Sequence, residues 1–276
     1  MKIVADTATL FPPAQGSEMG MTIIPVCVCI NNKTYKDYEE ISSKEFLELI
    51  AAGGKPTSSQ PALGDLLEVM DSSHEEMLVL TVGDGLSGAY QTALGARNCA
   101  ENRERIHVVD SRTLAGPLRY LAQKAVALKD KGITIGEIKA QLQESIDTSL
   151  SFVVPADFEF LKRSGRLTPI TAKVGGVLKL LPVLTQTEDK KRIKPVTVKR
   201  SWHAAFAAIL EQMARAGVDP SWHVTVCHAG TPDLAQTALD KVHSALPGCD
   251  AEVLELSPAL ITHGGPGCVV IQAVKK

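Results

Sequence analysis

The sequence predicts an α/β protein of two domains: an N-terminal α/β/α layered domain on a mostly parallel sheet, and a C-terminal α+β domain with a more antiparallel sheet. Short apolar segments alternate with capped helices through the first half, a pattern typical of parallel sheets covered by helices on both faces. Near Ser149 the pattern changes, and strands follow one another across a charged turn. The 276 residues are long enough to bury two moderate cores. We expect the domains to comprise residues 1–148 and 149–276.

Helix-start signals divide the first half into its elements. Ser42 with Glu45 and Thr134 with Glu137 have the spacing of capping boxes, and Pro61 suits the first turn of another helix. The expected strands are residues 2–5, 22–30, 77–82 and 106–109, and the expected helices are residues 43–52, 61–70, 87–99, 114–131 and 134–147.

The second half begins with a strand and then holds a long apolar stretch, residues 170–184. Residues 188–192 are all charged and indicate a hairpin turn between strands 183–184 and 196–198. Ser201 is the expected cap of a helix. The remaining expected elements are strand 152–154, helices 201–216 and 231–246, and strands 223–227, 251–256 and 268–273.

The composition argues against several functional classes. The net charge is −2, from 29 basic and 31 acidic residues, and aromatic residues make up 4% of the chain, so nucleic acid is a poor candidate partner. No segment approaches the roughly 20 apolar residues of a membrane span, and the N-terminus lacks the apolar region of a secretory signal. We therefore expect a cytoplasmic protein, monomeric and without stable membrane insertion.

The six cysteines are expected to be reduced thiols that are mostly buried. None forms a CxxC pair or another spacing of the zinc type. His228 beside Cys227 is a weak pair for a metal. We expect no metal and no cofactor.

Three separate polar segments, each following an apolar run, are the candidate binding residues: 56–61, 86–91 and 261–267. They combine hydroxyls, glycines and one imidazole, which suits a small anion such as a carboxylate. Ser87 and Gly88 precede a predicted helix, whose N-terminal amides would favour a negative guest. The alternative for Ser87 is a simple helix cap. His263, alone, is more often a structural hydrogen bonder, so the interpretation depends on the three segments meeting at one edge of the sheet.

In these residues the chain resembles the DegV family of fatty-acid-binding proteins. Six segments resemble family motifs in sequence order: 6–10, 35–37 with 41–46, 56–61, 86–91, 161–166 and 262–267. The 56–61 segment is similar to Thr-Ser-Gln-Pro with one additional serine. The 86–91 segment is similar to Leu-Ser-Gly-Thr-Tyr-Gln, and the 161–166 segment to Leu-Lys-Lys-Gly-Gly-Arg.

This resemblance implies a long-chain fatty acid bound between the two domains. Its carboxylate would be held by Thr57 or Ser58, by Ser87 with Gly88, and by His263. It further implies that the protein is no enzyme itself but presents the acid to a separate fatty acid kinase, which forms an acyl phosphate.

Two segments depart from the family pattern. Lys199 and Arg200 stand where the family has an Arg-Thr-Arg stretch implicated in meeting the kinase. Asp84 stands where the family often has serine, and it would repel a carboxylate if it pointed inward.

A fatty acid is a reasonable ligand on energetic grounds. Each buried methylene contributes about 0.8 kcal/mol, whereas an ionised carboxylate needs several hydrogen bonds to be buried. Residues 174–181 are a candidate tunnel wall, and an ordinary core helix is the alternative. We expect no arginine clamp on the head group, because the acid must later leave as an acyl phosphate.

Two other functions remain open from the sequence. Gly85 to Ala89 nearly spells the G-x-S-x-G elbow of a serine esterase, with Ser87 as nucleophile and Asp110 and His263 completing a triad. Ala89 replaces the last glycine of that motif, and no HGGG-type segment lies upstream. A pure protein-interaction module is the third class.

Overall fold

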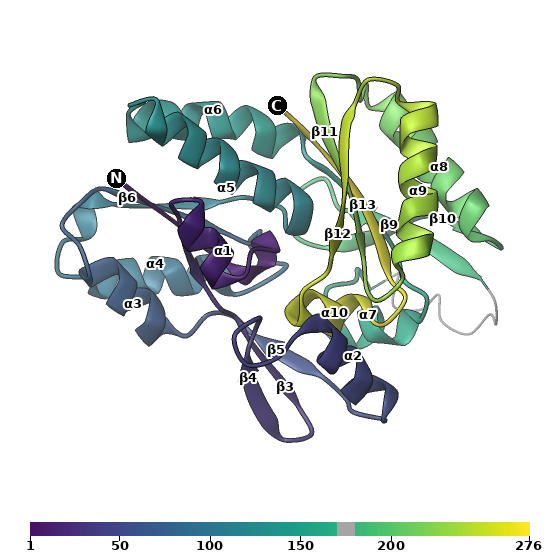
Figure 1. Ribbon diagram of the computed structural model, residues 1–276, viewed down its shortest axis with the longest axis horizontal. Coiled ribbons are helices and arrows are strands. Elements are labelled where there is room, and N and C mark those ends of the chain that lie inside the picture. Colours follow the sequence, from purple (N-terminus) through teal and green to yellow (C-terminus); the bar gives the residue numbers. More distant parts are fainter. Residues whose placement is uncertain (170–179) are drawn as a thin grey trace.

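The computed structural model describes residues 1–169 and 180–276, which form three sheets surrounded by helices (Figure 1). The expected tunnel-wall segment 174–181 therefore lies outside the described residues, apart from its last two positions. The strands are β1 Lys2–Asp6, β2 Thr22–Ile24, β3 Cys27–Ile30, β4 Lys33–Lys36, β5 Thr57–Ser59, β6 Met77–Thr81, β7 Ile106–Asp110, β8 Leu150–Val154, β9 Leu181–Gln186, β10 Ile193–Lys199, β11 Trp222–His228, β12 Asp250–Glu255 and β13 Val269–Lys275.

Ten α-helices lie in the described part of the chain. They are α1 Pro13–Glu18, α2 Ser43–Ala51, α3 Leu63–Asp71, α4 Ala89–Cys99, α5 Ala115–Asp130, α6 Ile135–Thr148, α7 Phe158–Ser164, α8 Trp202–Arg215, α9 Pro232–Ala245 and α10 Pro258–Gly264. Both predicted capping boxes are present, at the starts of α2 and α6.

The first sheet has the strand order β2-β1-β6-β7 and is parallel throughout. Alternate residues along each strand point to opposite faces of the sheet and pack in different hydrophobic cores. Ile3 and Leu78 pack with α5 and α6, whereas Val4 and Val79 pack on the opposite face with α3 and α4. The predicted layered N-terminal architecture is thus confirmed.

The second sheet, β10-β9-β8-β13-β11-β12, is antiparallel except for the pair β11–β12. This confirms the predicted change of sheet type. Helices α8 and α9 cover one face, where Phe206 and Ile209 are fully buried. Helix α5 contacts β11 and β13, so it lies between the two large sheets (Figure 1).

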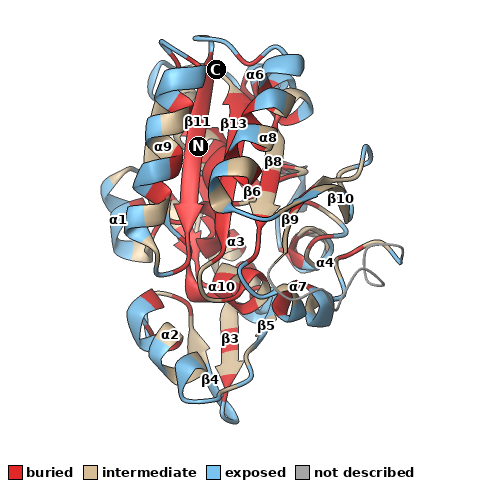
Figure 2. Cartoon of the chain, turned by 90° about the vertical axis from the view of Figure 1, so that its right-hand side faces the viewer, coloured by how far each residue is buried: buried red, intermediate tan, exposed pale blue. Residues whose placement is uncertain are grey.

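A third, small sheet of order β4-β3-β5 extends away from the two large sheets (Figure 2). We expected one strand over residues 22–30, and this was wrong: the chain leaves the parallel sheet after β2 and begins β3 in a different sheet. The predicted Asn31-Asn32 turn is present, and both residues have positive φ, 53° and 60°.

Other boundaries also differ from the expectations. Helix α3 begins at Leu63, two residues after Pro61, and α4 begins at Ala89 with Gly88 as its cap. Helix α7 was not predicted. Of the thiols, Cys227, Cys249 and Cys268 are buried, whereas Cys99 is exposed and the two on β3 are half-buried.

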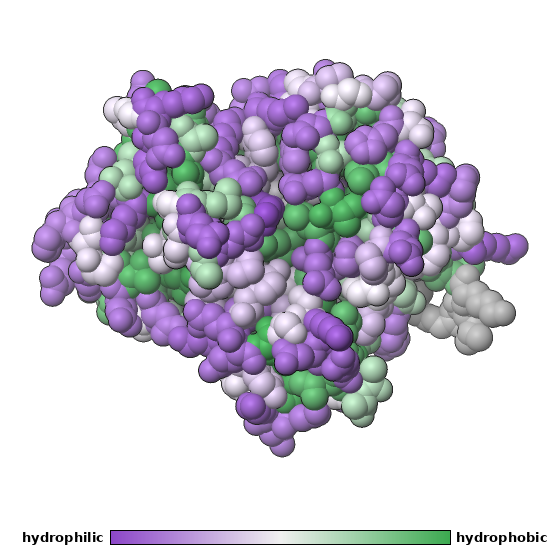
Figure 3. All heavy atoms as spheres, viewed as in Figure 1, coloured by the Kyte–Doolittle hydropathy of each residue, from purple (hydrophilic) through white to green (hydrophobic). Residues whose placement is uncertain are grey.

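The face shown in Figure 3 is mostly polar, and apolar side chains reach it near its centre, where the parts built on the two large sheets meet. Among the described residues, no helix combines the length and apolar character needed to cross a bilayer. In the same residues, no group of His, Cys, Asp and Glu side chains is arranged to hold a metal ion.

Candidate functional site

A large cavity, about 1150 Å³ including its mouth, lies between the parts of the molecule built on the two large sheets. Residues from both of these parts line it. Most of the surface is apolar, and polar side chains are restricted to particular places. The main apolar lining residues are Ala8, Val26, Val82, Leu86, Leu114, Phe152, Val153, Leu161, Ile193, Leu256, Ala259, Leu260 and Val270.

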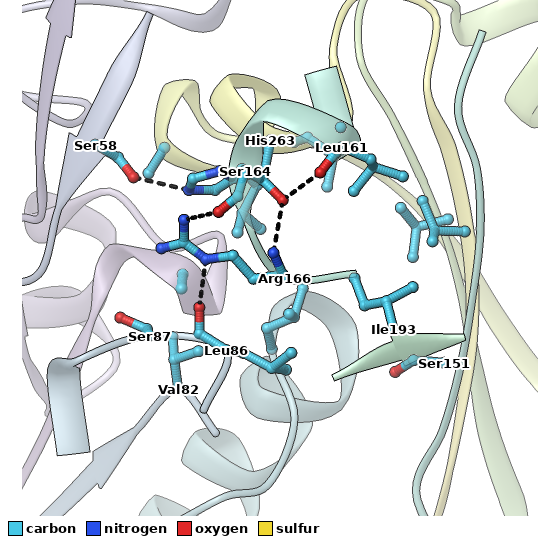
Figure 4. Close-up of a pocket in the computed structure, with 18 of the residues that line it drawn as sticks. Ser58, Val82, Leu86, Ser87, Ser151, Leu161, Ser164, Arg166, Ile193 and His263 are labelled. Carbon is cyan, nitrogen blue, oxygen red and sulfur yellow. Dashed lines mark hydrogen bonds between the residues drawn. The ribbon is translucent and has the colours of Figure 1, made fainter. Parts of the chain in front are cut away.

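Ser58 and His263 meet at one end of this cavity, 205 residues apart in sequence. The Ser58 Oγ lies 2.8 Å from the His263 Nε2 (Figure 4). We had expected both residues to lie in loops, and this was wrong. Ser58 lies on β5, paired with Val28 of β3, and His263 lies in the last turn of α10, which contacts β3 and β5. The small sheet and α10 therefore hold these two side chains together.

The His263 imidazole is neutral in this environment. Burial, together with the smaller effect of the nearby positive charge of Arg166, lowers its pKa to about 3. A neutral ring has one donor and one acceptor nitrogen. With Ser58 on Nε2, the pair can offer a hydrogen bond to an anion without carrying a net charge.

Ser87 and Gly88 lie in the turn between β6 and α4, and both line the cavity. The Ser87 Oγ accepts a hydrogen bond from the Ala89 amide at 3.2 Å. Ser87 thus caps one amide at the start of α4, as the alternative interpretation of this serine predicted. Within the described residues its hydroxyl hydrogen has no acceptor. A Cβ at Gly88 would approach Gln60 Cδ to 3.2 Å, so glycine suits this crowded rim.

The structure distinguishes between the two candidate hydroxyls on β5. Thr57 is exposed and does not line the cavity, whereas Ser58, Ser59 and Gln60 do. Because side chains alternate along a strand, Ser58 faces the opposite way from Thr57.

Arg166 is a lining residue to which sequence reasoning gave no role. Its Nε donates to the Leu86 carbonyl at 3.0 Å, and its Nη1 contacts the Ser164 carbonyl (Figure 4). Burial lowers the pKa of this guanidinium. The expectation that no arginine clamps the head group stays a prediction, because the Arg166 guanidinium lines the cavity but donates to backbone carbonyls. The family resemblance was the signal that could have identified Arg166, because this residue ends one of the six matching segments.

Asp84, the acid that departs from the family pattern, is not among the lining residues. Its carboxylate accepts from Lys191 Nζ at 3.0 Å and from Gln91 Nε2 at 3.2 Å. These contacts, the Lys191 hydrogen bond above all, keep the pKa of Asp84 below its usual range. The negative charge is thus paired outside the cavity and does not oppose an anion inside it.

The residues of the alternative esterase triad do not assemble in the described part of the chain. The Asp110 carboxylate accepts from the backbone amides of Asp84 and Arg112, at 3.0 and 2.9 Å. His263 contacts Ser58, and no hydrogen bond joins Ser87, Asp110 and His263. The geometry lacks the base-to-nucleophile contact that this chemistry requires.

Lys199 ends β10 and Arg200 follows it, away from the cavity lining. Arg200 is exposed, and within the described residues neither side chain forms an ion pair. Both charges are therefore available to another molecule.

Comparison with known proteins gives a consistent result. Residues 1–276 match the family model described as "Uncharacterised protein, DegV family". A DegV domain-containing protein of Halalkalibacterium halodurans is 30% identical over 273 residues, covering 97% of this chain and 95% of the relative.

Two solved structures are similar over the whole chain. A DegV family protein from Thermus thermophilus, described by its fatty acid binding, has 26% identity and a TM-score of 0.90, covering 100% of this chain and 99% of the other. DegV of Bacillus subtilis, described as a fatty acid binding protein, has 25% identity and a TM-score of 0.86 with the same coverage.

Proposed function

The chain belongs to the DegV family, and on that premise we propose that it binds a long-chain fatty acid in the cavity between two domains, residues 1–148 and 149–276. The observation that carries the proposal is the cavity itself, which combines a mostly apolar lining with neutral hydrogen-bonding groups gathered at one end. The fatty-acid-binding relatives from Thermus thermophilus and Bacillus subtilis support the same ligand class.

The carboxylate is proposed to lie among Ser58, Ser87, the Gly88 backbone and His263. Ser58 is preferred to Thr57 because only Ser58 lines the cavity. A buried carboxylate is costly unless several donors surround it, and bonds to an ionised acceptor are the stronger ones. Arg166 adds a positive charge at the same end, and because it is engaged with backbone carbonyls it favours the anion chiefly through its charge.

The acyl tail is proposed to occupy the apolar part of the cavity. At about 0.8 kcal/mol per methylene, a tail of about sixteen carbons supplies roughly 12 kcal/mol before the costs of association and ordering. Those costs reduce the net affinity well below this value. The tail therefore supplies most of the binding energy, and the polar end supplies orientation.

The protein is proposed to act as a carrier that presents the acid to a separate kinase for conversion to an acyl phosphate. Lys199 and Arg200 are the candidate contacts with that kinase. They are free of intramolecular ion pairs in the described part of the chain and lie outside the cavity, so a partner could use them without touching the lipid.

Native mass spectrometry of freshly purified protein, followed by organic extraction, tests the proposal. We expect a mass increment that matches one or more fatty acids in the extract. Protein that carries no acid, and that takes up none when offered hexadecanoic acid, would contradict it. A fluorophosphonate probe tests the alternative, because labelling of Ser87 would indicate an esterase.

A further inference from the structure

Polar residues occupy paired positions on three neighbouring strands of the second large sheet, and together they form a row across it. Gln272 of β13 lies opposite Ser151 of β8 and, on its other side, opposite Thr225 of β11. Two residues away on the same face of β13, Val270 lies between Val153 and Cys227. On this face of the sheet, an apolar row of residues is thus followed directly by a polar row.

This row bounds part of the cavity already described. Ser151, Gln272 and Gln186 line it together with the apolar residues. In Figure 4, Ser151 lies on the opposite side of the pocket from Ser58, His263 and Ser87, and apolar side chains are drawn in between. The cavity therefore has a second polar region, remote from the Ser58–His263 pair.

Gln272 is buried, and its own hydrogen bonds fix it in place. Its Oε1 accepts from the Gly116 amide at 3.1 Å, and its Nε2 donates to the Leu114 carbonyl at 3.1 Å and to Ser151 Oγ at 2.8 Å. Because the Ser151 oxygen accepts from Gln272, its hydroxyl is held in position. Its hydrogen has no acceptor in the residues that the structure describes.

Gln186 supplies the complementary group. Its Nε2 donates to the carbonyls of Arg112 and Lys190, at 3.0 and 3.1 Å. Both amide hydrogens are thereby used, while the Oε1 has no donor among residues 1–169 and 180–276. The second polar region therefore presents one fixed donor, on Ser151, and one fixed acceptor, on Gln186.

We propose that the cavity is built for a fatty acid that carries a hydroxyl group on its chain, remote from the carboxylate. This inference rests on the proposed fatty-acid function. A hydroxyl can accept from Ser151 and donate to Gln186 at once, whereas an unsubstituted tail would cover both groups and leave them without water. Buried polar groups that lose their partners oppose binding.

Titration calorimetry with delipidated protein tests the ligand class. Hexadecanoic acid is compared with hydroxyhexadecanoic acids whose hydroxyl stands at successive mid-chain positions or on the terminal carbon. We expect at least one hydroxy acid to bind about fivefold more tightly than the unsubstituted acid, the gain of one neutral hydrogen bond. If hexadecanoic acid binds as tightly as, or more tightly than, every hydroxy acid, the inference is wrong while the fatty-acid function stands.

Two variants locate the preference. Ser151→Ala removes the donor and leaves only the Gln186 acceptor, so it is expected to reduce the preference for the hydroxy acid, whereas Ser151→Thr keeps a hydroxyl and retains the preference. Val153→Ala on the same strand face is the control, because it removes two apolar carbons and is expected to weaken both acids alike, by roughly tenfold.

A preference that Ser151→Ala leaves undiminished would overturn the assignment to Ser151. Should that variant not fold, the wild-type comparison among acids still decides the ligand class. Failure of every acid to bind would be a different result, because it contradicts the fatty-acid function itself.

Discussion

At the scale of single residues, the His263 imidazole makes stability depend on pH. Its pKa is about 3 in the folded protein and about 6.5 in an unfolded chain. Below about pH 6.5 the unfolded state therefore binds a proton that the folded state does not. This stabilising contribution is complete above that pH and is lost as the pH falls toward 3.

We predict that delipidated wild-type protein loses stability relative to His263→Gln as the pH falls from about 7.5 to about 5.5, by on the order of 1 kcal/mol per pH unit below the unfolded pKa. Urea unfolding of both proteins measures this. Asp6 and Asp37, whose pKa values burial raises to about 6 and about 7, act in the opposite sense but equally in both proteins. A difference in unfolding free energy that does not vary with pH would contradict a neutral, buried His263.

Adjacent hydroxyls on β5 provide a second test at this scale. Ser58→Ala is expected to raise the Kd for hexadecanoic acid by about tenfold or more, because bonds to a charged group contribute about 1.5–3 kcal/mol. Thr57→Ala is the matched control and is expected to leave the Kd unchanged, since Thr57 is exposed and outside the cavity lining. Equal Kd values for the two variants would remove Ser58 from the head-group site.

The sequence located the residues at the polar end but not their contacts. Ser58 and His263 were both candidates, yet their meeting at 2.8 Å depends on how α10 packs against the small sheet. Whether Asp84 faced the ligand depended on Lys191, 107 residues away. Such contacts are set by tertiary packing, which the spacing of residues along one chain does not specify.

At the scale of elements, predictions held where local chemistry decides. The capping boxes of α2 and α6 were found because both partners lie within four residues of each other. Helix α10 was mistaken for a loop because it has only seven residues and its C-terminal end is rich in glycine, which is typical of loops. The break between β2 and β3 was missed because it marks a change of sheet, which the apolar pattern of residues 22–30 does not record.

Helix α5 offers a test of how the two large sheets are held together. A Cβ at Gly116 would lie 1.8 Å from Thr225 Oγ1, so the helix packs directly on β11 only with glycine there. We predict that Gly116→Ala destabilises the protein by about 1–3 kcal/mol in urea unfolding, the usual cost of overpacking.

Gly136→Ala in α6 is the control for that substitution. Nothing lies within 4 Å of a Cβ at Gly136, and alanine is the better helix former by about 1 kcal/mol. This variant should be neutral or more stable. Gly116→Ala with unchanged stability would show that α5 does not depend on this close contact.

At the scale of the whole molecule, the order of strands and helices predicted the two types of sheet, because each follows from local alternation. The cavity between them did not follow in the same way. Its lining draws on η1 (Thr7–Thr9), α10 and the second sheet together, and α5 lies between the sheets in a position that no sequence pattern specifies. Only the family resemblance led us to predict a ligand site between two domains.

The proposed carrier role makes a last prediction, about the molecule and a partner kinase. Lys199→Glu/Arg200→Glu reverses two charges at the end of β10 that have no ion-pair partner among residues 1–169 and 180–276, and it should slow phosphorylation of the bound acid by a partner fatty acid kinase. Charge complementarity acts mainly on association rates, so the loss is expected to be about tenfold or more at low salt and smaller at high salt. Calorimetry should find the Kd for hexadecanoic acid unchanged, since neither residue lines the cavity.

Lys44→Glu/Lys139→Glu is the matched control for this variant. It makes the same change in net charge at two exposed positions on α2 and α6, so it separates a local docking surface from a general electrostatic effect. Equal phosphorylation rates for the two double variants would exclude Lys199 and Arg200 from the docking surface. A rate lost only in the first, together with undiminished lipid binding, would place the kinase contact at the end of β10 and away from the lipid.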